Sequence, residues 1–128
     1  MKRSIALLSL ALFTAAFAAD RTTPSAILKT PGKFDHKVIT VTGVVAKFVA
    51  RASDSGKYFL FDLTEGKDKI AVFGRGELKP APKNGDKVEA TGEFEVARKV
   101  GDRTYKNEIE VTSKGHDKNG VTIVKSGK

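Results

Sequence analysis

The chain has 128 residues, of which 23 are Lys or Arg and 15 are Asp or Glu, and it contains no Cys. The lack of Cys excludes disulfides, a lipid-modified N-terminal Cys, covalent c-type haem attachment and any thiolate metal site. The positive net charge permits an anionic partner such as nucleic acid, an anionic glycan or a lipid headgroup, but a surplus of surface Lys also simply keeps a small protein soluble.

The first 18 residues have the pattern of a signal peptide. Basic residues at the start precede an apolar run over Ser4–Phe17, and Ala16–Ala18 supplies the small residues that signal peptidase prefers. The alternative, an uncleaved membrane anchor, is disfavoured because the run is shorter than the ~20 residues that span a bilayer. We expect cleavage after Ala18 or nearby. The mature protein would then be periplasmic or secreted, without a membrane span, and would keep 21 basic against 15 acidic residues.

The mature chain is long enough for one domain with its own core, since about 110 residues remain. Residues 19–31 are a polar lead in which Pro24–Lys29 favours a helical turn that ends at Pro31. The first long strand is predicted from Lys37 to about Arg51, with Ile39, Val41 and Val45 on one face. Gly43 inside this strand predicts either a bulge or a sharp bend.

A hairpin over residues 56–73 is the strongest local signal in the chain. Tyr58–Leu63 is rich in aromatic and branched residues, and the Gly-containing turn Thr64–Asp68 separates it from a second strand, Lys69–Phe73. Side chains alternate along a strand, so Phe59, Phe61 and Leu63 share one face and Tyr58, Leu60 and Asp62 share the other. Both faces are largely apolar, and the alternation leaves open which of them is buried.

The second half of the chain predicts two more strands. Gly74–Asp86 is too rich in Pro and Gly for a regular helix. Lys87–Val96 then repeats the Thr-Gly pair of the first strand, and Thr104–Thr112 alternates so that Tyr105, Asn107, Ile109 and Val111 oppose Lys106, Glu108 and Glu110. Gly120–Lys125 is either a short sixth strand or part of a loose tail. We therefore predict an all-β fold, a small five-stranded antiparallel Greek-key barrel over residues 32–113 with a short N-terminal helical turn, followed by a tail over residues 114–128.

The sequence resembles the oligonucleotide/oligosaccharide-binding (OB) fold, in particular its anticodon-binding-like modules, from about Thr30 to Ser113. The matching segments are Gly32–Val38 leading into Val41–Val45, then Tyr58–Gly66, then Gly85–Val88 leading into Thr91–Gly92. It departs from many members in having a short Pro-rich link where a helix often lies. In its export signal and single domain it is also similar in plan to small periplasmic bacterial OB-fold proteins associated with stress tolerance.

The resemblance implies a binding site on the second and third strands, flanked by the loops that join strands one and two and strands four and five. Cations for phosphates and aromatic rings for stacking are what single-stranded nucleic acid requires. The expected ligand-binding residues are Lys47, Arg51 and Lys57 in the first loop, Arg98, Lys99, Arg103 and Lys106 in the second, and Tyr58, Lys69, Phe73 and Arg75 on the hairpin. Two simpler interpretations stay open: the two aromatic residues can belong to the core, and the loop cations can be ordinary solvated charge. Glu residues on the outward sides of the fourth and fifth strands limit any anion site to a local one.

A weaker resemblance concerns His116. The run His116-Asp117-Lys118-Asn119 is similar to the haem-attaching segment of the periplasmic haem chaperones of cytochrome c maturation, although Gly120 stands where that family has Tyr. The same residues are also good turn sequence, and His36 is expected to be a surface residue in a turn and no ligand.

The chain has none of the common enzyme motifs, such as Gly-x-Ser-x-Gly, a phosphate-binding Gly-rich loop or paired His with metal spacing. We expect a binding module without cofactor, which takes single-stranded nucleic acid or another anionic ligand. The alternatives are a periplasmic protein-interaction or stress-response module and, more remotely, a haem carrier that uses His116.

Overall fold

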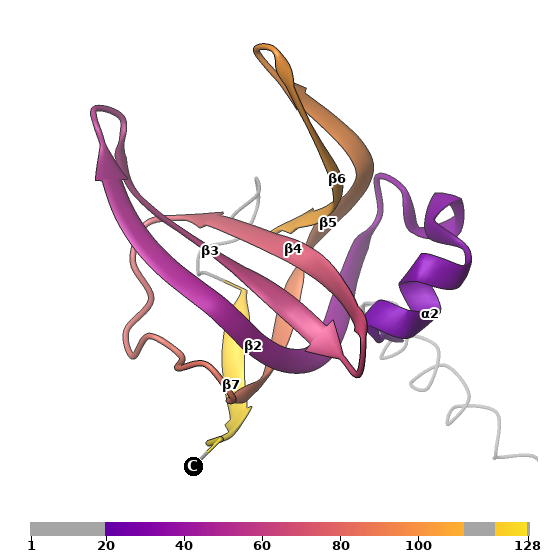
Figure 1. The fold of residues 1–128 in the computed structure, drawn as a ribbon, viewed down its shortest axis with the longest axis horizontal. Coiled ribbons are helices and arrows are strands. Elements are labelled where there is room, and N and C mark those ends of the chain that lie inside the picture. The colour runs from indigo at the N-terminus through magenta and orange to yellow at the C-terminus, as the bar shows by residue number, and fades with distance from the viewer. Residues whose placement is uncertain (1–19, 112–119, 128) are drawn as a thin grey trace, which may run out of the picture.

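The computed structural model describes residues 20–111 and 120–127, and this part of the chain is mostly β-sheet (Figure 1). The expected signal peptide, residues 1–18, and His116 lie outside the described residues. No helix in the described ranges is long and apolar enough to cross a bilayer. The elements are β1 (Asp20–Thr22), α2 (Pro24–Lys29), the 3₁₀ turn η1 (Pro31–Phe34), β2 (Val38–Ser53), β3 (Gly56–Glu65), β4 (Asp68–Arg75), β5 (Lys87–Val100), β6 (Arg103–Glu110) and β7 (Val121–Lys125).

Five of the strands form a closed ring in the order β2, β3, β4, β6 and β5, because β2 pairs with both β3 and β5. Neighbours in the ring are antiparallel except β4 and β6, which are parallel. β7 adds an antiparallel strand beside β5, and β1 adds a parallel strand beside β2. The all-β class and the helical turn are thus confirmed, and of the two alternatives for Gly120–Lys125 the structure has the strand. The prediction of a wholly antiparallel arrangement is wrong at β4 and β6, which are parallel, and β1 is missing from the prediction.

The core fills the inside of this ring and settles the orientation of the β3–β4 hairpin. Phe59, Phe61 and Leu63 are all buried, so the opposite face of β3 points outward. Ile27 of α2 is also fully buried, and the helix packs against β2, β3 and β4. Each such side chain contributes about 1.5–3 kcal/mol on burial. The six-residue helix therefore covers one opening of the ring, although it is too short to be stable in isolation.

The two Thr-Gly pairs lie where a long strand changes its partner. β2 pairs with β5 up to Val44 and with β3 from Val44 onward, and a Cβ at Gly43 would come within 2.9 Å of the Thr64 carbonyl oxygen. β5 changes from β2 to β6 at Glu93, and a Cβ at Gly92 would come within 2.0 Å of the Glu110 carbonyl oxygen. Both glycines thus allow two strands to approach closely at a corner of the ring. The bulge itself lies further along β2, between Ala46 and Val49.

Asp86 ties the link after β4 to the end of the chain. Its carboxylate accepts hydrogen bonds from the Lys83 and Gly127 backbone N–H groups, at 2.9 and 2.8 Å. These two hydrogen bonds, the one from Lys83 first, hold the pKa of the Asp86 carboxyl below its ordinary value. The charged form is therefore the one that the fold prefers.

We expect Asp86→Asn to lower the melting temperature at pH 7, because the amide keeps the shape but turns an N–H group toward backbone donors. A carboxyl whose pKa is depressed by folding stabilises the fold above its unfolded pKa, about 3.9, and this contribution is lost as the pH falls through the folded value. Melting curves of parent and variant should therefore converge below about pH 4. An equal difference at all pH values would contradict the assignment.

Candidate functional site: an aromatic and arginine cluster between two hairpin arms

Two hairpins extend beyond the ring as arms, and in Figure 1 their tips lie at the upper left and at the top. The first arm is the paired end of β2 and β3, which turns at residues 54–55, and the second is the paired end of β5 and β6, which turns at Gly101–Asp102. The prediction placed seven cations in loops at these positions. That placement is wrong, because strand pairing continues almost to the tips, so each cation has a fixed place on a strand.

The outward face of the sheet between the arms carries a cluster of rings and guanidinium groups. Tyr58 and Phe73 lie with their ring centroids 6.0 Å apart. Arg75 and Arg98 each place their guanidinium carbon 5.4 Å from the centroid of Phe73, and Arg98 lies equally close to the ring of Tyr105. We call these five residues the aromatic–arginine cluster. Contacts of this kind stabilise by ~0.5–1 kcal/mol each at exposed sites.

The two aromatic residues predicted to bind the ligand, Tyr58 and Phe73, are thus on the outside of the ring. Tyr58 and Phe73 are half-buried by one another and by the arginines, and they take no part in the core. This corrects the simpler interpretation that placed them inside. Their rings lie where β3 and β4 are paired, since Tyr58 pairs with Arg75, and Phe73 with Leu60.

Arg98 is held in place by a buried carboxylate. Glu108 is only 3 % exposed, and its Oε1 atom accepts a hydrogen bond of 2.6 Å from the Arg98 Nε atom. Burial raises the pKa of Glu108, Arg98 opposes this rise, and the nearby carboxylates of Glu110 and Glu95 add to it. The Glu108 carboxylate therefore largely compensates the charge of Arg98. The flat guanidinium group of Arg98 lies against the rings of Phe73 and Tyr105.

The position of Glu108 was missed because the alternation of β6 is interrupted. Asn107 has a φ of 52°, in the left-handed region. It lies between the Glu95–Glu108 and Ala97–Lys106 pairs and is itself not paired with a residue of β5. Tyr105 and Glu108 consequently contact the same Arg98, although strict alternation predicts opposite faces. Asn adopts a positive φ more often than most residues, but the presence of an Asn in a strand does not by itself indicate that it does so.

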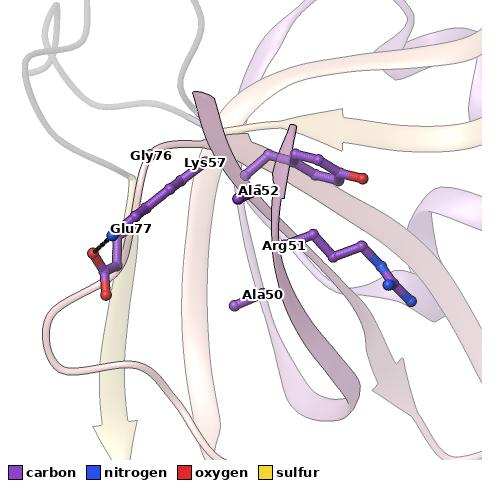
Figure 2. A pocket seen from close by; sticks show the side chains of 7 residues that line it. Ala50, Arg51, Ala52, Lys57, Gly76 and Glu77 are labelled. Atoms are coloured by element: carbon purple, nitrogen blue, oxygen red, sulfur yellow. Dashed lines mark hydrogen bonds and ion pairs between the residues drawn. The ribbon is translucent and has the colours of Figure 1, made fainter. Parts of the chain in front are cut away.

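An open pocket of about 250 Å³ lies beside the cluster, at the base of the first arm (Figure 2). Arg51 pairs with Tyr58 across β2 and β3, so these two side chains share the outward face with Arg75. Lys57 points the other way in Figure 2 and forms an ion pair of 3.0 Å with Glu77. The pocket is lined by Ala50, Arg51, Ala52, Lys57, Tyr58, Gly76 and Glu77.

The remaining predicted residues do not join the cluster. Lys69 lies four residues before Phe73 on β4, about 13 Å along the strand, and its Nζ atom is 3.6 Å from the Asp62 carboxylate. Lys47 sits in the β2 bulge with a φ of 56°, beside Phe48, whose ring packs on Phe59 and Phe61. Three further cations are exposed on the second arm, namely Lys99, Arg103 and Lys106.

A second pocket, of about 330 Å³, lies at the other end of the β3–β4 hairpin. Among the residues that line it is Glu65, whose carboxylate accepts a hydrogen bond from the Ser25 backbone N–H at the start of α2. The Thr23 hydroxyl, and then Ser25, hold the pKa of Glu65 below its ordinary value. This carboxylate therefore caps the helix, and no residue of the predicted site lines the pocket.

No family model matches this chain, and no curated protein sequence matches it as a relative. The function is consequently argued from the geometry of the cluster and the arms.

Proposed function

We propose that the protein is an exported binding module of the OB-fold type that takes single-stranded nucleic acid, or another anionic ligand with flat rings, on the aromatic–arginine cluster. The proposal rests on one observation: Tyr58, Phe73 and Tyr105 lie with two arginines on one outward face, between two arms that carry further cations. The strand order of the ring and its single parallel pair support the OB topology.

The division of roles within the site follows from its charges. Rings of Tyr58 and Phe73 offer stacking surfaces, which contribute ~1–3 kcal/mol per base. Arg51 and Arg75 flank Tyr58 and would contact phosphates, and Lys99, Arg103 and Lys106 would extend the contacts along the second arm. Arg98, which is paired with Glu108, would stack and would contribute little net charge.

Carboxylates limit the length of strand that can bind. Glu93 and Glu110 form a cross-strand pair on the outward face of β5 and β6, and Glu95 lies two residues further along β5. A phosphate backbone would be repelled there, so the ligand would run across the first arm and the cluster and would avoid the middle of β5. The site would therefore hold a short segment of strand.

Fluorescence anisotropy with a labelled oligothymidylate tests this proposal. We expect binding at low salt that weakens as salt rises, with a logarithmic slope that falls by about 0.7 for each phosphate contact removed. Arg51→Ala/Arg75→Ala should lower both affinity and slope, whereas Lys69→Ala, which removes a cation away from the cluster, should change neither. Absence of binding at low salt, or binding that salt does not affect, would reject the nucleic-acid ligand.

A protein partner is the second candidate function, in line with a periplasmic interaction or stress-response module. Val100 and Tyr105 on the second arm are 49 and 36 % exposed and offer apolar surface to a partner. Arg103→Ala would leave such a contact intact, and a pull-down that captures one partner regardless of this substitution would favour it. The alternative of a haem carrier rests on His116 alone. It predicts that the protein mixed with haem shows a Soret band and that His116→Ala abolishes this band.

A further inference from the structure

A histidine and two glutamates form a separate group on the outward face of β5. The ligand atoms of His36, Glu93 and Glu95 all lie within 4.8 Å of one another. The Nδ1 atom of His36 is 3.7 Å from the Oε2 atom of Glu93. Zinc lies ~2.0–2.2 Å from such ligands, which places the ligand atoms of a tetrahedral ion about 3.4 Å apart. Small rotations of these exposed side chains would bring one imidazole nitrogen and two carboxylate oxygens to that spacing.

The backbone brings His36 to this position. Its N–H group donates a hydrogen bond of 2.7 Å to the Phe94 carbonyl oxygen, and the Phe94 N–H donates one of 2.9 Å to the Lys37 carbonyl oxygen. Phe94 is fully buried, so the two glutamates that flank it point outward. The turn before β2 is thus fixed beside the one residue of β5 that both glutamates adjoin.

A third carboxylate, that of Asp35, lies on the other side of the imidazole. The Oδ1 atom of Asp35 accepts a hydrogen bond of 2.9 Å from the Val96 N–H, which fixes the carboxylate, and its Oδ2 atom lies 3.4 Å from the His36 Nε2 atom. Histidines that bind metals usually donate their second ring N–H to a carboxylate or carbonyl, which directs the free nitrogen toward the ion. Here that arrangement would direct Nδ1 toward Glu93.

Carboxylates stand opposite one another across the strands beside this group. Glu93 faces Glu110 and Glu95 faces Glu108 across β5 and β6, and like charges in directly opposite positions destabilise a sheet. Arg98 is the cation nearest to these pairs along β5, and it is engaged by Glu108. A divalent cation at His36 would relieve the repulsion that remains.

We propose that His36, Glu93 and Glu95 bind a divalent first-row transition metal, of which Zn²⁺ is the representative. Imidazole nitrogen selects this class over Ca²⁺ and Mg²⁺, which prefer oxygen ligands alone. Three protein ligands leave a fourth position of a tetrahedral ion open to water or to a second ligand. The site is distinct from the aromatic–arginine cluster, and it uses a histidine that the sequence suggested was an ordinary surface residue.

Isothermal titration calorimetry with ZnCl₂ tests the proposal on the purified protein. We expect one equivalent to bind, and we expect His36→Asn and Glu93→Gln/Glu95→Gln each to weaken the affinity at least tenfold. Asn tolerates the left-handed backbone that His36 adopts, with a φ of 65°, so the turn should be preserved. As controls, His116→Asn should bind as the parent does, and Glu110→Gln, which removes a neighbouring charge but no ligand, should weaken the affinity by less than the double Gln variant does. Excess Mg²⁺ should not compete.

A second readout identifies the ligand nitrogen. Histidine ring resonances in ¹⁵N NMR spectra should shift for His36 and not for His116 on addition of one equivalent of Zn²⁺. Failure of the parent to bind Zn²⁺ would overturn the proposal. Loss of binding in His116→Asn, or equal weakening in Glu110→Gln and the double Gln variant, would also overturn it, because either result would place the metal elsewhere or make it a diffuse counterion.

Discussion

Arg98→Ala should lower the free energy of unfolding by about 3 kcal/mol at pH 7, because it leaves the Glu108 carboxylate buried without its partner. Breaking a buried ion pair from one side costs about 3–5 kcal/mol, and the lower value applies because the Arg98 side chain keeps 25 % of its surface exposed. Urea denaturation followed by circular dichroism measures the change. Arg103→Ala, on the exposed end of the same arm, should stay within about 0.5 kcal/mol of the parent.

The loss should shrink at acid pH. Burial already raises the pKa of Glu108 above its ordinary value despite Arg98, and removing Arg98 raises it further. An acid with a raised pKa in the fold binds its proton more tightly there than in the unfolded chain, so stability falls as the pH rises from the unfolded value, about 4.3, through the folded one. Below this pH range Glu108 is neutral in the parent and in Arg98→Ala. The difference in stability then comes only from the lost packing of the Arg98 side chain. A loss that is the same at pH 4 and pH 7, or that Arg103→Ala reproduces, would contradict the role assigned to the pair.

This result bears on any binding test that uses Arg98. A variant such as Arg98→Ala/Arg103→Ala would lose stability and ligand contacts together, so weaker binding would not identify a phosphate contact. The combination Arg98→Met/Glu108→Gln removes both charges and nearly keeps the side-chain volume. It should fold stably, because neutral side chains of similar volume often replace a buried ion pair at little cost. The affinity of this double variant for an oligonucleotide shows what the Arg98 guanidinium group contributes to binding, because no carboxylate is left unpaired.

Phe73→Ala should weaken binding of single-stranded nucleic acid by about tenfold to a hundredfold, since a stacked base contributes ~1–3 kcal/mol. Phe73 is the ring that Tyr58, Arg75 and Arg98 all contact, so its removal also disperses the other stacking surfaces. Anisotropy titrations at constant salt measure the effect. Its side chain lies outside the core, so the variant should still fold, with a loss of about 1–2 kcal/mol from its contacts with Arg75 and Arg98.

Two variants test whether the ligand needs an aromatic ring or only an apolar side chain at this place on the sheet. Phe73→Leu keeps an apolar side chain on β4 but offers no ring, so it should bind nearly as weakly as Phe73→Ala. Tyr58→Phe keeps the ring and should bind nearly as well as the parent. Should Phe73→Leu retain full affinity, the rings would not be the surface on which the ligand stacks.

Local patterns were enough to predict most of the fold. The hairpin from Tyr58 to Phe73, the bent strands with Thr-Gly pairs and the helical turn near Ile27 each rest on neighbours in the sequence, and each was found. β1 was missed because three polar residues show no alternation, and its place depends on the β2 edge that it joins. The end of the second arm was missed for a similar reason: β5 continues to Val100 and not to about Val96, because polar side chains on both faces resemble a loop.

The site was less predictable because it depends on which face of each strand is buried. Tyr58, Phe73, Arg75 and Arg98 were all named as candidates, but their mutual contacts follow from the closure of the ring, which brings β4 beside β6. Glu108 was predicted on the outward side of the fifth strand, and that placement is wrong because its carboxylate is buried against Arg98. An interrupted alternation at Asn107 turns it toward Arg98, and the residue type gives no warning of this.

Closure of the ring also has a consequence for the order in which the protein folds. The β3–β4 hairpin joins residues close in sequence, as in the pair Glu65 and Asp68, whereas the pairing of β2 with β5 joins residues about fifty positions apart, as in Thr40 and Thr91. Closing a long loop costs entropy before the distant contacts form, and folds dominated by such contacts take milliseconds to seconds. The central hairpin should therefore form first, and the Thr40–Thr91 hydrogen bond of 2.7 Å should appear among the last native contacts.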